Sequence, residues 1–508
     1  MSSTPDILLE IVRKRADRIR HNGADQGLAL PSKRQAPLVD FMAPGHPVAR
    51  HPTAGGSNSG ILIAEIKRRS PSRGDIDAIP EPQLLAAHYK DVGFRRVSVL
   101  TEEAQFGGSL YDLMAVKNAH PDLAVLRKDF LLTLEDVEVS YRAGADAILL
   151  IATLLEPGVL TAMYHRSREL GMRALVEVHN EVDVQRVRHL APPLVGINSR
   201  DLRRFTVDPL IPLEIRSSIN WDCQVVYESG ISSENDVLFV RGSGFGGFLM
   251  GEALVRSPEL GAKAMRAWEN EKEARRRYAV WERLYLRHRA GVPLVKICGI
   301  TNREDALAAV DAGADMLGFV MAPSPRQTSA ALIRECADQK VLKAAVVVLK
   351  ADEKVSDELR CFLDEGLLDF LQFHGDETPQ TVQNWPSYKA LNLRTCQDAE
   401  AMDSAGSPAV LVDAFSPTAR GGTGKRLDSS LLSAAAERRR LWIAGGLNAE
   451  NVAAIVDEWK PGLVDVSGGV EASKGRKNHK ALRRFVAEAK GKNRGESGSI
   501  GNNKELTK

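Results

Sequence analysis

Short apolar runs alternate with longer, charged stretches along most of the chain. From Ile61 onward, each apolar run is followed by a segment whose apolar residues recur at helical spacing. Regular alternation of this kind is typical of βα units arranged around a parallel sheet. We predict eight strands before residue 255 and eight after it, at 61–67, 95–101, 123–129, 147–152, 173–179, 194–199, 224–229 and 247–252, and then at 294–299, 316–321, 343–349, 370–375, 388–393, 409–414, 441–446 and 463–469.

Two sets of eight strands predict an α/β fold with two tandem (β/α)8 TIM barrels. An open, doubly wound sheet is the structural alternative, but neither half has a G-x-G-x-x-G turn after its first strand. The stretch 264–291 is dense in Arg and Glu with an apolar stripe at helical spacing, which predicts a helix that joins the barrels. The predicted segments are a first barrel at 1–260, a helical linker at 261–292, a second barrel at 293–490 and a disordered tail at 491–508, with a loop at 42–60.

Composition narrows the class of protein. The 508 residues carry a formal net charge of +2, with 26% charged and 44% hydrophobic residues, so no electrostatic footprint for nucleic acid or an acidic membrane is present. Five scattered cysteines without a C-x-x-C pair indicate neither a disulfide framework nor a metal site. The first 20 residues have acids among their bases and are unlike a secretory signal, and no apolar run approaches the roughly 20 residues that span a bilayer. We expect a cytoplasmic, monomeric protein that binds small molecules.

Polar residues gather where the strands of the first half end. Because these ends meet at one mouth of a barrel, the side chains should share a site, and a low dielectric there would shift a Lys or Glu pKa toward neutrality. Isolated ion pairs at the rim are the simpler alternative for any single residue. The glycines after the last two strands would supply backbone N–H groups for a phosphate. The candidates are Glu65, Lys67, Lys128, Glu177, Asn198, Glu228, Ser229, Gly230 and Gly251.

The first half resembles indole-3-glycerol-phosphate synthase over residues 1–260, on the motifs AEIKRRSPSRG, LTEEAQFGGS, VLRKDF, LVEVHN, GINSRDL, YESGIS and FLMGEAL. The resemblance implies that Lys128 is the general acid of ring closure and that Glu177 is the base of the later dehydration. Lys67, beside Glu65, would contact the substrate carboxylate or act as the acid of dehydration. The other implied roles are aromatic walls at Phe106 and Phe130, substrate contacts at Asn198 and Glu228, and phosphate contacts at Ser70, Ser229, Gly230 and Gly251.

A single cysteine, Cys298, follows the first strand of the second half, and Asp413 ends the sixth. Such a cysteine is more often a small buried hydrophobe than a catalyst. However, KICGIT, PSPRQTS, LQFHGDE, LVDAFSPTARGGTGK, IAGGLN and VDVSGGVE resemble phosphoribosylanthranilate isomerase over residues 293–490. The resemblance implies that Cys298 is the base, that Asp413 is the acid and that Arg326 binds the anthranilate carboxylate. It also implies phosphate contacts at Gly445, Gly446, Ser467, Gly468 and Gly469, while His374 is either structural or functional.

The two resemblances describe consecutive reactions, since the isomerase product is the synthase substrate. We therefore predict a bifunctional enzyme of tryptophan biosynthesis, an isomerase and a carboxy-lyase, whose partners are phosphorylated anthranilate-sugar substrates. Neither reaction requires a metal or an organic cofactor. Two alternatives remain open. One is another phosphosugar barrel, such as an aldolase with a Schiff base on Lys128; the other is a pair in which one barrel is inactive and serves as a binding scaffold.

Overall fold

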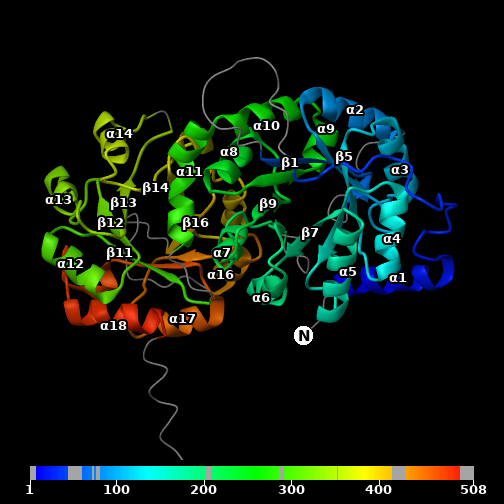
Figure 1. Ribbon diagram of the computed structural model, residues 1–508. Helices are drawn as coiled ribbons and strands as arrows, with labels where there is room; N and C mark the ends of the chain where they lie inside the picture. The colour runs from blue at the N-terminus through cyan, green and yellow to red at the C-terminus, as the bar shows by residue number, and fades with distance from the viewer. Residues whose placement is uncertain are drawn as a thin grey trace, which may run out of the picture. The chain divides into compact units, whose positions relative to one another are not determined.

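The structure of the protein is a computed structural model that describes residues 7–43, 60–70, 74–75, 81–200, 207–286, 291–351, 353–414 and 429–491. The chain divides into two compact units, Met1–Glu282 and Arg283–Lys508. Each unit contains a closed barrel of eight parallel strands surrounded by helices (Figure 1). The two barrels confirm the predicted fold class. Nearly all of the tail and of the loop predicted from the sequence lies outside the described residues.

The first barrel closes because β1 (Ile61–Ile66) pairs in parallel with both β4 and β10. Its other strands are β4 (Arg96–Leu100), β5 (Ala124–Lys128), β6 (Ala147–Ile151), β7 (Arg173–Val178), β8 (Leu194–Asn198), β9 (Gln224–Glu228) and β10 (Gly247–Met250). The helices around it are α2 (Pro82–Val92), α3 (Leu110–Ala119), α4 (Leu134–Ala143), α5 (Pro157–Glu169), α6 (Glu181–Val187), α7 (Ile211–Ser217), α8 (Glu234–Gly242) and α9 (Glu252–Arg256), with a 3-10 turn at Arg188–Leu190. Burial on both faces explains why these strands are continuous apolar runs.

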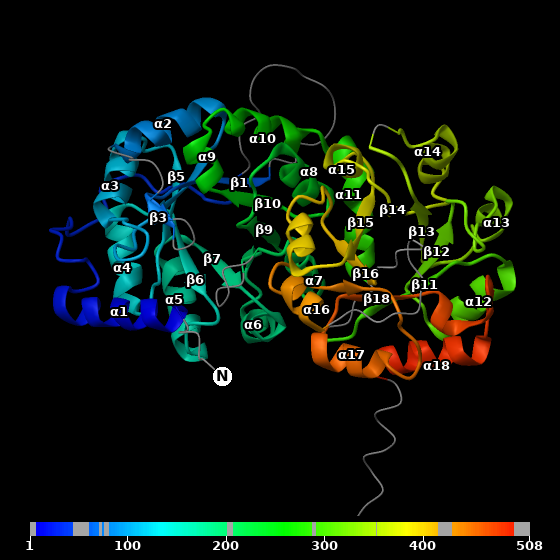
Figure 2. The ribbon, with the colours of Figure 1, turned by 180° about the vertical axis from the view of Figure 1, so that it is seen from behind.

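The second barrel closes between β11 (Leu294–Cys298) and β18 (Leu463–Val466). Its remaining strands are β12 (Met316–Val320), β13 (Leu342–Val347), β14 (Phe370–Phe373), β15 (Ser387–Leu393), β16 (Val410–Ala414) and β17 (Trp442–Ile443). Around it lie α12 (Arg303–Ala312), α13 (Ala330–Glu335), α14 (Asp357–Asp364), α15 (Pro379–Gln383), α16 (Ser429–Ala436), α17 (Val452–Trp459) and α18 (His479–Ala489), with 3-10 turns η2 (Cys396–Met402) and η3 (Gly468–Val470). Helices α17 and α18 pack side by side (Figure 2).

One helix, two hairpins and a connecting segment lie outside the regular βα alternation. Helix α1 (Ile7–Asn22) precedes the first barrel, and two short hairpins, β2 (Arg69–Ser70) with β3 (Gly74–Asp75) and β19 (Glu471–Ser473) with β20 (Arg476–Lys477), follow barrel strands. Where the sequence suggested one connecting helix, the structure has two, α10 (Leu260–Glu269) and α11 (Glu271–Tyr285). The break falls at Asn270, whose side chain accepts a hydrogen bond from the N–H of Glu273 and so caps the second helix.

Helices α10 and α11 pack on the first barrel. The rings of Phe239 and Tyr278 meet edge to face with centroids 5.6 Å apart. A Cβ at Gly242 of α8 would lie 2.1 Å from the carbonyl oxygen of Ala274, so the helix backbones touch where the side chain is missing. In the described part of the chain, no helix combines the length and the hydropathy needed to cross a bilayer.

The interior of the first barrel explains where its polar residues lie. Alternate strand residues form an aliphatic cluster inside the barrel, which includes Ile61, Ile63, Leu126, Leu175 and Val226. Because side chains on a strand alternate with a period of two, the next inward positions lie one layer higher, at the carboxyl ends of the strands. Those positions are occupied by Glu65, Lys128, Glu177 and Glu228, together with Gly196 and Gly251.

Candidate active sites

Lys128 lies at the centre of the charged layer in the first barrel. Its ammonium nitrogen is 3.1 Å from Oε2 of Glu177 and forms a second, shorter ion pair with Glu228. The side chains of Lys128, Glu177 and Glu228 are 13%, 3% and 1% exposed, so all three charged groups are almost completely shielded from solvent. A Cβ at Gly196 would lie 2.0 Å from Oε1 of Glu228, so this carboxylate occupies the space that the glycine leaves.

Burial and mutual attraction set the charge of this cluster. Burial alone would lower the pKa of Lys128, but Glu228 and Glu177 outweigh it and raise that pKa well above its usual range. Burial alone would also raise the pKa of Glu177, but the charge of Lys128 and a contact with His179 lower it far below its usual range. Burial raises the pKa of Glu228 to about 8 against the charge of Lys128. The pKa values of Lys128 and Glu177 thus move away from neutrality, so the shift expected from the sequence is wrong for this pair, because their mutual attraction outweighs burial. The charged forms of both groups are favoured.

His179 was not identified from the sequence. Its Nε2 is 2.8 Å from Oε1 of Glu177, and although burial opposes it, this contact raises the pKa of His179. Two positions separate the residues on β7 and the loop that follows, so they share a face. The only sequence signal for His179 was its position two residues after Glu177 in LVEVH.

A second ion pair lies at the end of β1, where Lys67 is 3.0 Å from Oε1 of Glu65. A Cβ at Gly251 would lie 2.6 Å from the same oxygen, so the glycine after β10 leaves space for Glu65. Asn198 reaches Glu177 only at 3.5 Å, the limit of a hydrogen bond. The predicted residues thus form two groups, one around Lys128 and one at Glu65 and Lys67.

The aromatic and phosphate candidates lie on the loops above these strands. The rings of Phe106 and Phe130 are tilted by 33° with centroids 6.4 Å apart. Ser229 and Gly230 follow β9 with positive φ angles of 69° and 74°, and a Cβ on Gly230 would come within 2.5 Å of Val207. Gly251 is the N-cap of α9. The side chain of Ser70 lies outside the described part of the chain.

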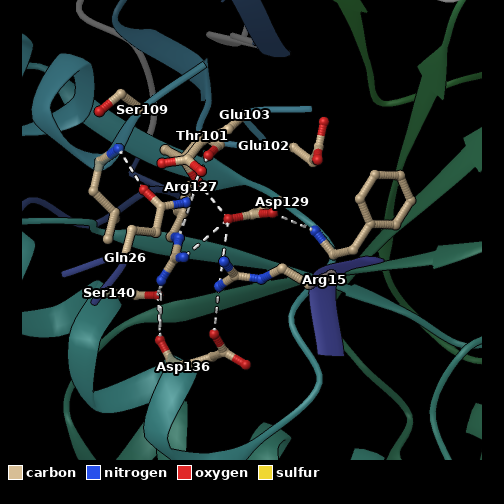
Figure 3. A network of polar contacts seen from close by, with 12 residues as sticks. Arg15, Gln26, Thr101, Glu102, Glu103, Ser109, Arg127, Asp129, Asp136 and Ser140 are labelled. Atoms are coloured by element: carbon tan, nitrogen blue, oxygen red, sulfur yellow. Dashed lines mark hydrogen bonds and ion pairs between the residues drawn. The ribbon is translucent and has the colours of Figure 1, made fainter. Parts of the chain in front are cut away.

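A buried network of charges adjoins Lys128 (Figure 3). Arg127, which is fully buried, donates to Asp129 at 2.9 Å, and Arg15 of α1 donates to Asp136 of α4 at 2.8 Å. Arg15 also lies 3.8 Å from Asp129. The network joins α1 to the loop after β5, and Lys128 is the last residue of that strand. Helix α1 is therefore part of the support of this strand end.

In the second barrel, Cys298 ends β11 and Asp413 lies near the end of β16. The thiol is 8% exposed, and burial raises its pKa, although the charge of Lys296 opposes this. Nε2 of His374 lies 3.7 Å from Oδ2 of Asp413, and burial lowers the pKa of this histidine to about 4. His374 thus lies beside the candidate acid as a neutral ring.

Arg326, the predicted carboxylate ligand, already binds a carboxylate. Its Nε and a terminal nitrogen donate to the two oxygens of Glu471 at 2.7 and 2.9 Å. Lys477 contacts the same Glu471 at 3.2 Å and donates to the carbonyl oxygen of Cys298 at 2.6 Å. Neither Glu471 nor Lys477 was identified from the sequence, because the β19–β20 hairpin lies outside the βα pattern.

The glycines at the ends of β17 and β18 form a tight turn region. Gly445 and Gly446 have φ angles of 84° and 66°. A Cβ on Gly469 would lie 1.9 Å from the carbonyl oxygen of Leu447, so only glycine fits there. Ser467 and Gly468 begin the η3 turn.

No group of three or more His, Cys, Asp or Glu side chains within the described ranges could hold a metal ion.

Comparison with protein families follows the same division of the chain. Residues 13–267 match the model of indole-3-glycerol phosphate synthase, and residues 295–488 match that of N-(5'-phosphoribosyl)anthranilate isomerase. The chain belongs to these two families, in that order. Both resemblances drawn from the sequence motifs are confirmed.

Similar proteins include multifunctional relatives and relatives of each single family. The multifunctional tryptophan biosynthesis protein of Phycomyces blakesleeanus is 31% identical over 85% of this chain and 63% of its own length. The indole-3-glycerol phosphate synthase of a Nocardioides strain is 41% identical over 46% of this chain and 90% of its own. A crystal structure of the Thermotoga maritima phosphoribosylanthranilate isomerase shares 34% identity, covers 39% of this chain and 99% of its own, and has a TM-score of 0.35. The chain thus spans 63% of the length of the first multifunctional relative.

Proposed function

We propose that this chain is a bifunctional enzyme of tryptophan biosynthesis that catalyses two consecutive reactions. The second barrel converts N-(5-phosphoribosyl)anthranilate to 1-(2-carboxyphenylamino)-1-deoxyribulose 5-phosphate, and the first converts that product to indole-3-glycerol phosphate. The order of the two families and the multifunctional relatives support the pairing. The observation that carries the proposal is the protonated Lys128 held between Glu177 and Glu228, because ring closure needs a proton donor.

The isomerase step is an Amadori rearrangement that needs one acid and one base. Asp413 donates a proton to the furanose ring oxygen as its bond to C1 breaks and an imine forms. The thiolate of Cys298 then removes the proton from C2, and the resulting enolamine becomes the ketone of the product. Arg326 would bind the anthranilate carboxylate in exchange for Glu471. Gly445, Gly446, Ser467, Gly468 and Gly469 would bind the phosphate through backbone N–H groups, as the ends of barrel strands commonly do.

The synthase step forms a carbon–carbon bond and releases CO2 and water. Lys128 donates its proton to the ketone oxygen as the anthranilate ring carbon attacks, so that the developing alkoxide never bears a full charge. Loss of CO2 and of the resulting hydroxyl follows. In the dehydration, Glu177 accepts a proton from the methylene carbon next to the nitrogen. Lys67, held by Glu65, either binds the carboxylate or donates the proton to the leaving hydroxyl.

The remaining candidates take binding roles in this proposal. Phe106 and Phe130 would enclose the anthranilate ring, and Asn198 and Glu228 would orient the substrate. Ser70, Ser229, Gly230 and Gly251 would contact its phosphate. We assign the synthase to 1–260 and the isomerase to 293–490, with the helices between them as the connecting segment.

A coupled assay tests the proposal. The purified chain, supplied with N-(5-phosphoribosyl)anthranilate and no added metal, should release indole-3-glycerol phosphate and CO2 in equal amounts. Failure to form indole-3-glycerol phosphate from either substrate would contradict it. The aldolase alternative predicts that borohydride with substrate traps a covalent adduct on Lys128, whereas acid catalysis predicts no adduct.

A further inference from the structure

The interior of the second barrel contains a buried lysine to which no step above assigns a role. Lys296 lies on β11, two residues before Cys298, and is completely buried. Its ammonium donates to Oδ2 of Asp465 at 2.6 Å and to Oε1 of Gln372 at 2.7 Å. Burial alone would lower the pKa of Lys296, but Asp465 raises it well above its usual value. A permanent positive charge thus lies inside the barrel.

This charge lies directly beside the thiol. A Cβ at Gly318 of β12 would be 2.8 Å from Sγ of Cys298 and 3.0 Å from Cε of Lys296, so both side chains border the same glycine. The charged or titratable groups that act on the thiol come from every element around it: Lys296 on β11, Asp465 on β18, Lys477 on β20, Tyr388 on β15 and Arg326 in the loop after β12. Three of these groups are cations, and Lys296 acts most strongly among them.

The same ammonium fixes the orientation of a neighbouring amide. Lysine can only donate, so the Gln372 oxygen must face it, and the hydroxyl of Tyr388 donates to that oxygen at 2.9 Å. The NH2 group of Gln372 must then face Nδ1 of His374, which lies 3.2 Å away.

An amide NH2 at Nδ1 determines the tautomer of the ring. Nδ1 of His374 accepts the hydrogen bond, so the single proton of the neutral ring is on Nε2. That nitrogen is the one that lies 3.7 Å from Oδ2 of Asp413. One lysine is therefore connected to both proposed reacting groups, directly to the thiol and through Gln372 and His374 to the carboxyl.

We propose that Lys296 is a positioning residue for the isomerase reaction, whose ammonium favours the thiolate of Cys298 and fixes the Nε2–H tautomer of His374 beside Asp413 and Asn392. This inference rests on the proposed function of the second barrel. A stability role alone explains the ion pair poorly, because replacing a buried ion pair by apolar residues of similar volume is often neutral or stabilising.

The first experiment measures the pH dependence of the isomerase. In Lys296→Met, the ascending limb of kcat/KM should move up by about one pH unit, because an adjacent opposite charge shifts a pKa by about that much or more. At neutral pH, kcat/KM should then fall about tenfold, because the thiolate fraction falls with it. The matched control is Lys343→Met, since Lys343 is also buried, at 5% exposed, but donates to the carbonyl oxygens of Gln339 and Val341. An unshifted limb in Lys296→Met would overturn the inference.

A second measurement does not depend on whether Lys296→Met folds. Nitrogen-15 NMR of the ring-labelled chain, with His374 assigned by its loss in His374→Gln, should show the Nε2–H tautomer; an Nδ1–H signal would overturn the inference. In Gln372→Leu the tautomer preference should weaken, while in Lys343→Met it should persist.

The two proposals can fail separately. If Cys298→Ala retained full isomerase activity, the proposed function would be wrong. If Cys298→Ala is inactive but Lys296→Met shifts nothing, only the role of Lys296 is wrong.

Discussion

The two barrels share one fold and differ in what fills their interiors. Beneath the charged layer of the first barrel lie the aliphatic residues Ile61, Ile63 and Leu126. The buried cation paired with this level, Arg96, donates to the carbonyl oxygen of Phe41 at 2.6 Å, and within the described residues the hydrogen bonds of its side chain include no carboxylate. Beneath the thiol of the second barrel lie Lys296 and Asp465, a buried ion pair. The first barrel surrounds one lysine with carboxylates and so keeps an acid protonated. The second places a cation beside a thiol, and this cation opposes the rise in the thiol pKa that burial causes. The same scaffold thus surrounds its two proposed reacting groups with buried charges of opposite sign.

The largest expected effect separates the two chemistries. Lys128→Ala should reduce ring closure by about 10²–10⁴-fold, because it removes the proposed proton donor, and should leave the isomerase unchanged. Cys298→Ala should do the reverse. Steady-state assays of each reaction with its own substrate measure both. Loss of both activities from either substitution in a folded chain would contradict two independent sites.

The next effect concerns stability and is confined to the first barrel. Arg15→Met leaves Asp136 buried without its partner and should cost about 3–5 kcal/mol, as breaking a buried pair does. Arg20→Met on the same helix is the matched control, because Arg20 and Asp17 form an exposed pair. Urea unfolding with both activities as probes should show early loss of the synthase alone. Equal midpoints for the two variants would disprove a supporting role of α1.

Two buried histidines should respond to pH in opposite directions. The pKa of His374 falls from 6.5 to about 4 on folding, so below pH 6.5 the unfolded chain binds a proton that the folded barrel does not. Its contribution is present above pH 6.5 and is lost as the pH falls toward 4, at a cost of about 3 kcal/mol. His374→Gln should therefore lose less stability than the parent chain over that range, measured by urea unfolding.

The matching measurement concerns His179 in the first barrel. The pKa of His179 is raised on folding, so its contribution is complete below its unfolded value and is lost as the pH rises through the folded value. His179→Gln should therefore differ most from the parent chain in acid and least in alkali. The same direction of pH dependence in both variants would contradict the comparison.

The smallest effect tests the glycines that leave space for reacting groups. Gly196→Ala should displace Glu228 and Gly318→Ala should displace Cys298, since the new methyl would lie 2.0 and 2.8 Å from them. Overpacking of this kind costs about 1–3 kcal/mol, so each substitution should lower only its own activity, roughly tenfold. Gly158→Ala has no atom within 4 Å of its new methyl and is the control. A synthase unaffected by Gly196→Ala would show that Glu228 has no role.

The sequence predicted the strands well because each is buried on both faces and therefore appears as a continuous apolar run. It also predicted that Lys128 and Glu177 share a site, because both lie where a strand ends and the strand ends of a barrel meet at one mouth. It could not predict which partners meet across strands. Lys296 is a single charge within an apolar strand, and its partner Asp465 lies 169 positions away. Arg15 lies in a charged helix, where an arginine is usually exposed, yet it is 1% exposed.

One strand of the second barrel is much shorter than the rest. Strand β17 aligns only two residues with each neighbour, whereas β15 and β16 align five. The hydrogen-bonded ring is therefore thinnest between the strand that carries Asp413 and the strand that leads to Ser467. Local opening of a fold begins where the fewest bonds must break. The amide protons of Trp442 and Ile443 should consequently exchange with solvent before those of any other strand in this barrel. Local opening of the barrel should therefore occur mainly between the proposed acid and the proposed phosphate contacts.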